Sequence, residues 1–194
     1  MSSRSRLVFV LLLLAACGGA VNRAPSQLDN ACSIVAQRPA YLRAMKQAEN
    51  KWNVPVPVQM ATIYQESKFR GRARTPRRWT LGVIPMGRQS SAYGYAQALD
   101  ATWDEYRDRT GRRSARRDRI RDATDFIGWY MDQTEKRNGV AKTDARNQYL
   151  AYHEGRTGFA QGTYRSKAWL MRIADEVANR AVMYDAQLQA CNRR

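Results

Sequence analysis

The stretch IYQES at residues 63–67 ends a predicted helix, and it contains one carboxylic acid, Glu66. Pro57 suits the first turn of that helix, which should run to about Ser67. Two more short motifs stand beside predicted helices: GYAQ at residues 94–97 and AYHEG at residues 151–155. Each motif is common by chance, so their order and their helical settings decide the fold.

Helical periodicity dominates the chain around these motifs. Asp100 is the expected N-cap of one short helix, and Gly111 the glycine that ends it. A loop rich in Arg, Gly and Pro is expected over residues 70–91, with residues 81–84 as the one short strand candidate. The other helices are predicted at 39–52, about 100–110, about 120–138, about 143–152 and, over about 24 residues, around 170–188. The fold class is therefore mainly α.

The three motifs together resemble those of the lytic transglycosylase domain, which has a goose-type lysozyme fold. The hallmarks of that family are Glu-Ser, a Gly-Leu-Met-Gln-like turn, and Ala-Tyr-Asn-x-Gly. The resemblance covers residues 38–185 and implies a single lysozyme-like helical domain. Tyr95 and Ala96 depart from the family's Leu and Met, and His153 departs from its Asn. A basic loop also lengthens the interval between the first two motifs. These departures concern the substrate groove more than the reaction class.

Glu66 is the predicted catalytic residue. Glycoside cleavage needs a carboxylic acid that stays protonated near neutral pH and donates its proton to the departing oxygen. Apolar neighbours such as Ile63 disfavour the charged form, and a position near a helix C-terminus raises the pKa further. A hydrophobic pocket gives a lysozyme glutamate its acid role in the same way. Taken alone, Glu66 would be interpreted as an ordinary solvated carboxylate at a helix end; the other two motifs favour the catalytic role.

Six further motif residues are candidates for binding the substrate: Ser67, Gly94, Tyr95, Gln97, Tyr152 and His153. The resemblance implies that Tyr152 orients Glu66 or supports the oxocarbenium-like transition state; a core tyrosine is the alternative. Gln97 is expected to shape the cleft floor, or only to hold a turn. Ser67 either contacts substrate or caps the helix, and His153 is expected to line the cleft.

The resemblance also implies a reaction that uses a single glutamate and no external water. Cleavage of the MurNAc-GlcNAc β-1,4 bond would leave a 1,6-anhydro sugar, because the C6 hydroxyl of the same sugar attacks C1. A hydrolytic muramidase is one alternative, with Glu154 as the obvious second carboxylate. A non-catalytic peptidoglycan-binding lipoprotein is the other.

The N-terminus predicts an export signal. A positively charged start precedes the apolar run LVFVLLLL at residues 7–14, which is too short to span a membrane. The next residues resemble a lipobox, LAAC at 14–17, which implies cleavage before Cys17 and its diacylation. A plain secretory signal is the alternative. Since Gly18 is not the aspartate that often retains lipoproteins at the inner membrane, we expect an anchor at the periplasmic face of the outer membrane.

The predicted organisation is a signal peptide at 1–16, a lipidated flexible tether at 17–31 and a transglycosylase-like helical domain at 32–194. With the first cysteine lipidated, Cys32 and Cys191 remain in an oxidising compartment. A disulfide between them would join the two ends of the mature chain; two unpaired thiols are the alternative.

The net charge of +16 predicts an anionic partner or surface. The basic residues concentrate at 68–78 and 107–121. An exported protein meets little nucleic acid, so we expect contact with stem-peptide carboxylates, envelope phosphates or membrane headgroups instead; a merely solvated basic surface is the alternative. The sequence holds one histidine and no metal or cofactor motif, so neither group is expected, and a monomer is predicted.

Overall fold

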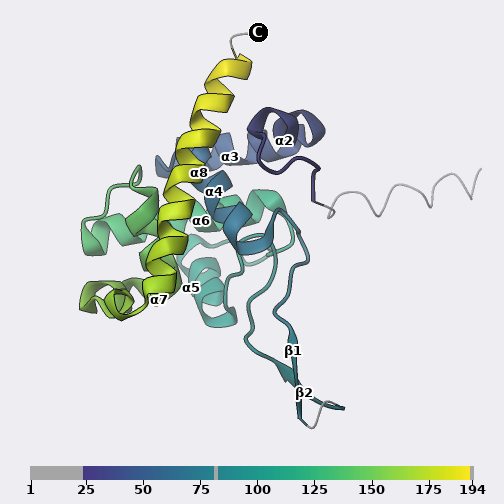
Figure 1. Ribbon diagram of the computed structural model, residues 1–194, viewed down its shortest axis with the longest axis vertical. Helices are drawn as coiled ribbons and strands as arrows, with labels where there is room; N and C mark the ends of the chain where they lie inside the picture. Colours follow the sequence, from purple (N-terminus) through teal and green to yellow (C-terminus); the bar gives the residue numbers. More distant parts are fainter. Residues whose placement is uncertain (1–23, 81–82, 193–194) are drawn as a thin grey trace, which may run out of the picture.

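The structure is a computed structural model that describes residues 24–80 and 83–192. The predicted signal peptide and Cys17 lie outside these residues. The helices are α2 (Ala31–Gln37), α3 (Pro39–Trp52), α4 (Val56–Ser67), α5 (Asp100–Thr110), α6 (Ile120–Asn138), α7 (Ala145–Gln161), the short 3-10 helix η2 (Thr163–Ser166) and α8 (Ala168–Asn192). The strands are β1 (Arg77–Thr80) and β2 (Ile84–Arg88). The domain is mainly α, as predicted (Figure 1).

Helix α6 lies at the centre of the domain. Every residue from Asp122 to Asp132 is buried, as expected for a helix surrounded by others. Helix α3 packs along it, while α8 packs against α4 and α7. The carboxylate of Asp125 in α6 accepts hydrogen bonds from the hydroxyl of Tyr106 (2.6 Å) and the indole of Trp52 (3.0 Å). The polar groups of the central helix are therefore paired within the core, which fixes the frame around the motifs.

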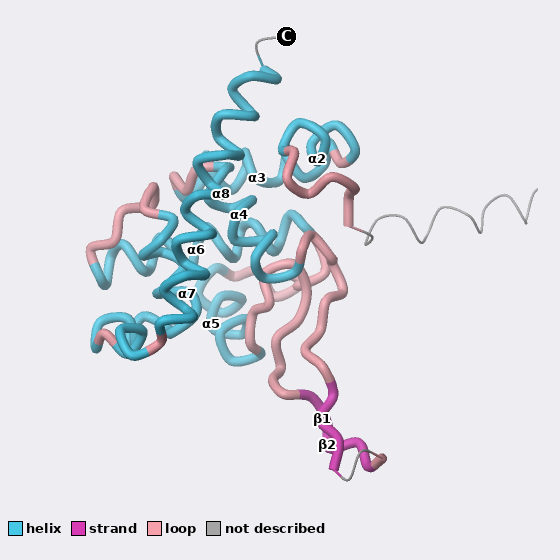
Figure 2. The backbone as a smooth tube through the Cα atoms, viewed as in Figure 1, coloured by secondary structure: helices cyan, strands magenta, loops and turns pink. Residues whose placement is uncertain are grey.

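The loop between the first two motifs carries a two-stranded hairpin that projects from the helical body (Figures 1 and 2). Strands β1 and β2 are antiparallel. Residues 81 and 82 of the predicted strand at 81–84 lie outside the described residues; β1 ends at Thr80 and β2 begins at Ile84, the last residue of that prediction.

Two helix boundaries differ from the prediction for local reasons. Asp100 is the first residue of α5, and Leu99 occupies the N-cap position, whereas Gly111 ends the helix as expected. Helix α7 extends beyond the predicted residue 152, to Gln161. Gly155 (φ 74°, ψ 155°) interrupts its helical conformation, so the predicted helix corresponds to the first segment of α7.

Part of the predicted basic surface is used inside the fold. Arg112 forms an ion pair with Asp122 (2.6 Å), and Arg117 pairs with Asp100 (2.6 Å) while donating to two backbone carbonyl groups. These contacts fix the loop between α5 and α6. The arginines of residues 107–121 are therefore not one uniform solvated face.

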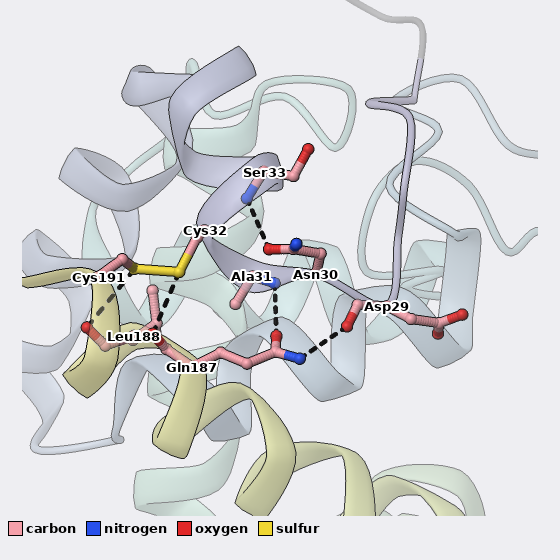
Figure 3. The surroundings of a disulfide bond; sticks show 8 residues. All are labelled: Asp29, Asn30, Ala31, Cys32, Ser33, Gln187, Leu188 and Cys191. Carbon is pink, nitrogen blue, oxygen red and sulfur yellow. Dashed lines mark hydrogen bonds between the residues drawn. A yellow bond between two sulfur atoms is a disulfide. The ribbon is translucent and has the colours of Figure 1, made fainter.

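The N-terminal end of the described chain is bound to α8 (Figure 3). The side-chain amide of Gln187 accepts from the backbone of Ala31 (2.7 Å) and donates to the carbonyl of Asp29 (3.0 Å). The flexible tether predicted for residues 17–31 therefore does not extend to its predicted end. Helix α2 was also not predicted; Asn30 caps it by accepting from the backbone N–H of Ser33 (2.9 Å).

A disulfide joins Cys32 of α2 to Cys191 of α8 (Figure 3), as the sequence predicts. The two cysteines are 159 residues apart in the chain, and their Cα atoms are 6.1 Å apart. Within the described residues, no helix is long and apolar enough to cross a membrane.

We expect Cys32→Ser with Cys191→Ser to lower the free energy of unfolding by about 2–4 kcal/mol, because the bridge restricts the unfolded chain over nearly its whole length. Urea denaturation with and without dithiothreitol measures this. The reductant should destabilise the unaltered protein and leave the double variant unaffected. Equal sensitivity of both proteins to reductant would contradict the prediction.

Candidate active site

Helix α4 delivers Glu66 to the site. Glu66 is the penultimate residue of the helix, and the chain leaves the helix through Lys68 in the left-handed conformation (φ 51°). Ser67 is buried, and its hydroxyl donates to the carbonyl of Ile63 one turn earlier (3.1 Å). These contacts hold the last turn of α4, so the position of the Glu66 carboxyl group is set by regular structure.

The carboxyl group of Glu66 shares a hydrogen bond with the hydroxyl of Tyr149 on α7. The residue remains partly exposed. Burial of the carboxyl group raises the pKa of Glu66 to about 7, although the bond from Tyr149 and the charge of Lys68 both act to lower it. At neutral pH a substantial fraction of Glu66 is therefore protonated.

Tyr152 lies one helical turn after Tyr149, on the same face of α7. Its hydroxyl donates to the backbone carbonyl of Ala96 (2.5 Å), and its ring packs edge-on against Tyr130 with centroids 5.0 Å apart. Burial and then the charge of Glu66 raise the pKa of Tyr152 well above its ordinary value. Tyr152 therefore stays neutral, and it joins the second motif to the third.

The turn at residues 94–97 is held by its own residues. Gly94 has a φ of 83°, and a Cβ atom there would overlap the backbone carbonyl of Arg117. The Gln97 side chain donates to the carbonyl groups of Ala73 (3.0 Å) and Gly94 (2.8 Å). Gln97 thus ties the turn to the loop that follows α4, in agreement with the turn-holding alternative.

Three of the predicted substrate-binding residues are buried in the structure. The Tyr95 side chain is 1% exposed, and its hydroxyl is hydrogen-bonded to that of Tyr41 (2.9 Å). Ser67 is equally buried, and Gly94 is covered by Arg117. These groups hold the frame of the site, and their predicted contact with substrate stays a prediction.

His153 lies at the surface, beside Glu154. Its ring is edge-on to Trp169, with centroids 5.3 Å apart, and its Nδ1 is 3.1 Å from a carboxylate oxygen of Glu154. The side chain is 37% exposed, so the predicted contact of His153 with substrate stays a prediction.

Glu154 is held in a different setting from Glu66. It accepts hydrogen bonds from Lys167 (2.8 Å) and Thr163. Burial opposes its ionisation, but these bonds and the one with His153 outweigh that effect and lower the pKa of Glu154 to about 2. Glu154 is therefore an ionised carboxylate already satisfied by its neighbours, and it cannot serve as an acid at neutral pH.

Tyr149 is the site residue that the sequence interpretation missed. It lies outside the three motifs and is 4% exposed, so it looks like an ordinary core residue. Its position three residues before Tyr152 was the available signal, because residues i and i+3 of a helix share a face. Only the packing of α7 beside α4 shows that this face meets Glu66.

We expect Tyr149→Phe to raise the pKa of Glu66. The hydrogen bond from Tyr149 stabilises the charged carboxylate, and the variant lacks that bond. If Glu66 acts as an acid, the high-pH limb of the pH–rate profile should shift to higher pH. The maximal rate should fall by about tenfold, because the carboxyl group loses the contact that orients it. A pH–rate profile measures both changes.

Tyr106→Phe is the matched control, since its hydroxyl bonds to Asp125 in the core. It should lower the stability and leave the pH profile unchanged. A profile that moves equally in both variants would contradict a special role for Tyr149.

Comparison with known families supports these observations. The family model described as the transglycosylase SLT domain matches residues 5–191. A comparison with curated protein sequences found no match. The family match spans nearly the whole sequence, including all three motifs that the fold brings together around Glu66. By that match the chain belongs to the transglycosylase SLT domain family, whose members are peptidoglycan lytic transglycosylases.

Proposed function

We propose that this protein cleaves the β-1,4 bond between MurNAc and GlcNAc in peptidoglycan without water, and leaves 1,6-anhydroMurNAc ends. Glu66 is the catalytic residue of this proposal. The single observation that carries it is the buried carboxyl group of Glu66 at the end of α4, whose pKa of about 7 and contact with Tyr149 suit proton transfer near neutral pH. Such a group exchanges its proton readily at neutral pH, as a residue that acts first as acid and then as base must do.

In the first step the protonated Glu66 donates its proton to the glycosidic oxygen while the bond from that oxygen to C1 of MurNAc breaks. Positive charge develops at C1 and the ring oxygen. In the second step the Glu66 carboxylate removes the proton of the C6 hydroxyl of the same MurNAc, and that oxygen bonds to C1. The glutamate ends protonated, ready for another cycle. Tyr149 orients the carboxyl group through both steps.

The setting of Glu154 favours this route over hydrolysis. A hydrolase needs a second carboxylate as nucleophile or as base for water. Lys167 and Thr163 already donate hydrogen bonds to the Glu154 carboxylate. Among the described groups that shift the pKa of Glu66, none is a carboxylate. The intramolecular C6 hydroxyl needs no second carboxylate, and its proximity gives it a high effective concentration.

The proposed location is the periplasmic face of the outer membrane, with the chain anchored by a diacylated Cys17. The lipobox-like segment LAAC at 14–17 supports this proposal. Labelling with a radioactive fatty acid tests it: the label should enter the unaltered protein and be absent from Cys17→Ala. Label retained in that variant would contradict lipidation at Cys17.

Digestion of purified peptidoglycan sacculi tests the reaction. We expect soluble muropeptides with 1,6-anhydroMurNAc ends, which weigh about 18 Da less than the reducing products of hydrolysis because water is not added. Mass spectrometry distinguishes the two. Reducing ends would identify a hydrolytic muramidase, and sacculi that bind the protein yet stay intact would identify a non-catalytic binding module.

A further inference from the structure

A cavity that does not include the residues around Glu66 opens between the starts of two helices. Its volume is about 680 Å³. It is bordered by the first residues of α3, the first residues of α6 and the loop before α6, with Tyr95 at its inner side. Glu66, Tyr149 and Tyr152 do not line it. The proposed reaction therefore leaves this cavity without a role.

Arginines surround the cavity. Six of them line it: Arg38, Arg43, Arg72, Arg116, Arg119 and Arg121. Asp118 is the one carboxylate among the described lining residues, and it is paired with Arg116 (3.0 Å) and Arg72 (3.9 Å). By contrast, Arg43, Arg119 and Arg121 are exposed and form no ion pair with any residue that the structure describes. The rim thus carries excess positive charge.

The helix starts add to this field. Helix α3 begins at Pro39 and α6 at Ile120, and both residues line the cavity. No side chain caps either helix, because the N-cap residues are Arg38 and Arg119. Pro39 has no backbone N–H, and the N–H groups of Tyr41 and Asp122 already bond to N-cap carbonyls. The two helix starts therefore contribute mainly the partial positive charge of their dipoles, which adds to the field of the arginines.

The walls of the cavity are apolar. Pro39, Ala40, the ring of Tyr41 and Ile120 contribute to them. The volume lies within the range of small-molecule binding sites. A free inorganic anion would leave these walls exposed to water, whereas a ligand with an apolar part would cover them. Guanidinium groups match phosphate oxygens in charge and in bidentate geometry.

We propose that this cavity binds an anionic phospholipid, with the phosphate group at the arginine rim and the adjoining hydrocarbon against Pro39, Ala40 and Ile120. The proposal does not depend on catalysis at Glu66. It assigns a specific anionic ligand to part of the basic surface, and it places lipid contact on the folded domain itself.

The probe is dihexanoylphosphatidic acid, used below its critical micelle concentration with the purified protein in isothermal titration calorimetry. We expect one saturable site. Arg119→Gln with Arg121→Gln should weaken binding by about tenfold or more, because two charge-assisted contacts are lost. Ala40→Phe should weaken it similarly by filling the cavity while the charge is unchanged.

Arg165→Gln with Arg172→Gln is the matched control. Both arginines are exposed and lie outside the cavity, and their replacement removes the same total charge. The control should bind the probe like the unaltered protein. Thermal melting of each variant checks that it is folded. If the glutamine variant does not fold, Arg119→Lys with Arg121→Lys replaces it; this variant keeps the charge and should retain part of the affinity.

Three outcomes would overturn the proposal. Equal affinity for inorganic phosphate would reduce the site to a phosphate site without a role for lipid. Equal affinity for dihexanoylphosphatidylcholine would remove the role of net negative charge. If Arg165→Gln with Arg172→Gln lost as much affinity as Arg119→Gln with Arg121→Gln, the cause would be the net charge of the protein and not the cavity. None of these results bears on sacculus digestion, so the two proposals fail separately.

Discussion

Glu66→Gln should abolish the formation of 1,6-anhydromuropeptides, with a rate about a thousandfold lower than that of the unaltered protein. The amide has nearly the size and shape of the carboxylic acid, but it can neither donate a proton to the glycosidic oxygen nor accept one from the C6 hydroxyl. Both proposed steps therefore fail at the same residue. Mass spectrometry of soluble products from sacculi measures the loss.

Glu49→Gln is the matched control for this substitution. The Glu49 side chain accepts from the backbone N–H of Val56 (3.0 Å), and a glutamine oxygen can accept the same bond. The control should digest sacculi at nearly the normal rate. Full activity of Glu66→Gln would remove Glu66 from the mechanism.

The pH dependence of stability tests the raised pKa of Glu66 independently of catalysis. Since the folded protein raises the pKa of Glu66 to about 7, the folded state binds a proton more tightly than the unfolded state. The resulting stabilisation is complete at low pH and is lost as the pH rises through about 7. The glutamine side chain does not titrate, so the variant should gain stability relative to the unaltered protein between about pH 5 and pH 8, by on the order of 1–3 kcal/mol. Thermal melting across this range measures it; a difference that is flat with pH would contradict the raised pKa.

Gly94→Ala should lower the free energy of unfolding by about 3–5 kcal/mol, because steric overlap adds to an unfavourable backbone conformation. At a φ of 83° a Cβ atom would meet the backbone carbonyl of Arg117, which is fixed by the loop before α6. The turn would have to move, and with it the carbonyl of Ala96 that holds Tyr152. Activity should therefore fall together with stability. Urea denaturation measures the stability, and sacculus digestion the activity.

Gly111→Ala separates the two causes. Gly111 also has a positive φ (69°), but a Cβ atom at this position would have no described atom within 4 Å. This control should lose only about 1–2 kcal/mol, the cost of the left-handed conformation. If both variants lost the same stability, the overlap with Arg117 would not be the cause.

The positions of most helices follow from the sequence because apolar periodicity and helix-ending residues are local signals. Pro57 and the end of α4, the glycine after α5, and the length of α6 were predicted in this way. The hairpin strands were not, since strand pairing depends on contacts between separate segments. Helix α2 was also missed, because it has only 7 residues and is held by its packing against α8 and α3.

The motifs predict Glu66 as the catalytic residue and Tyr152 as its neighbour, but they could not separate buried side chains from exposed ones. Ser67, Gly94 and Tyr95 share motifs with site residues and yet belong to the interior. Tyr149 lies outside every motif and yet is bonded to Glu66. Burial depends on which helices pack together, and no short segment contains that information.

The sequence by itself determined the fold class, the family and the residue at the centre of the proposed reaction, because these depend on local patterns and on residue types in order. It also paired Cys32 with Cys191. Only the tertiary structure decided what the two acidic residues of the motifs can do. Desolvation raises the pKa of Glu66, whereas Lys167 and its neighbours lower that of Glu154. A pKa depends on the groups that surround a carboxylate in space, and folding brings those groups together from distant parts of the chain.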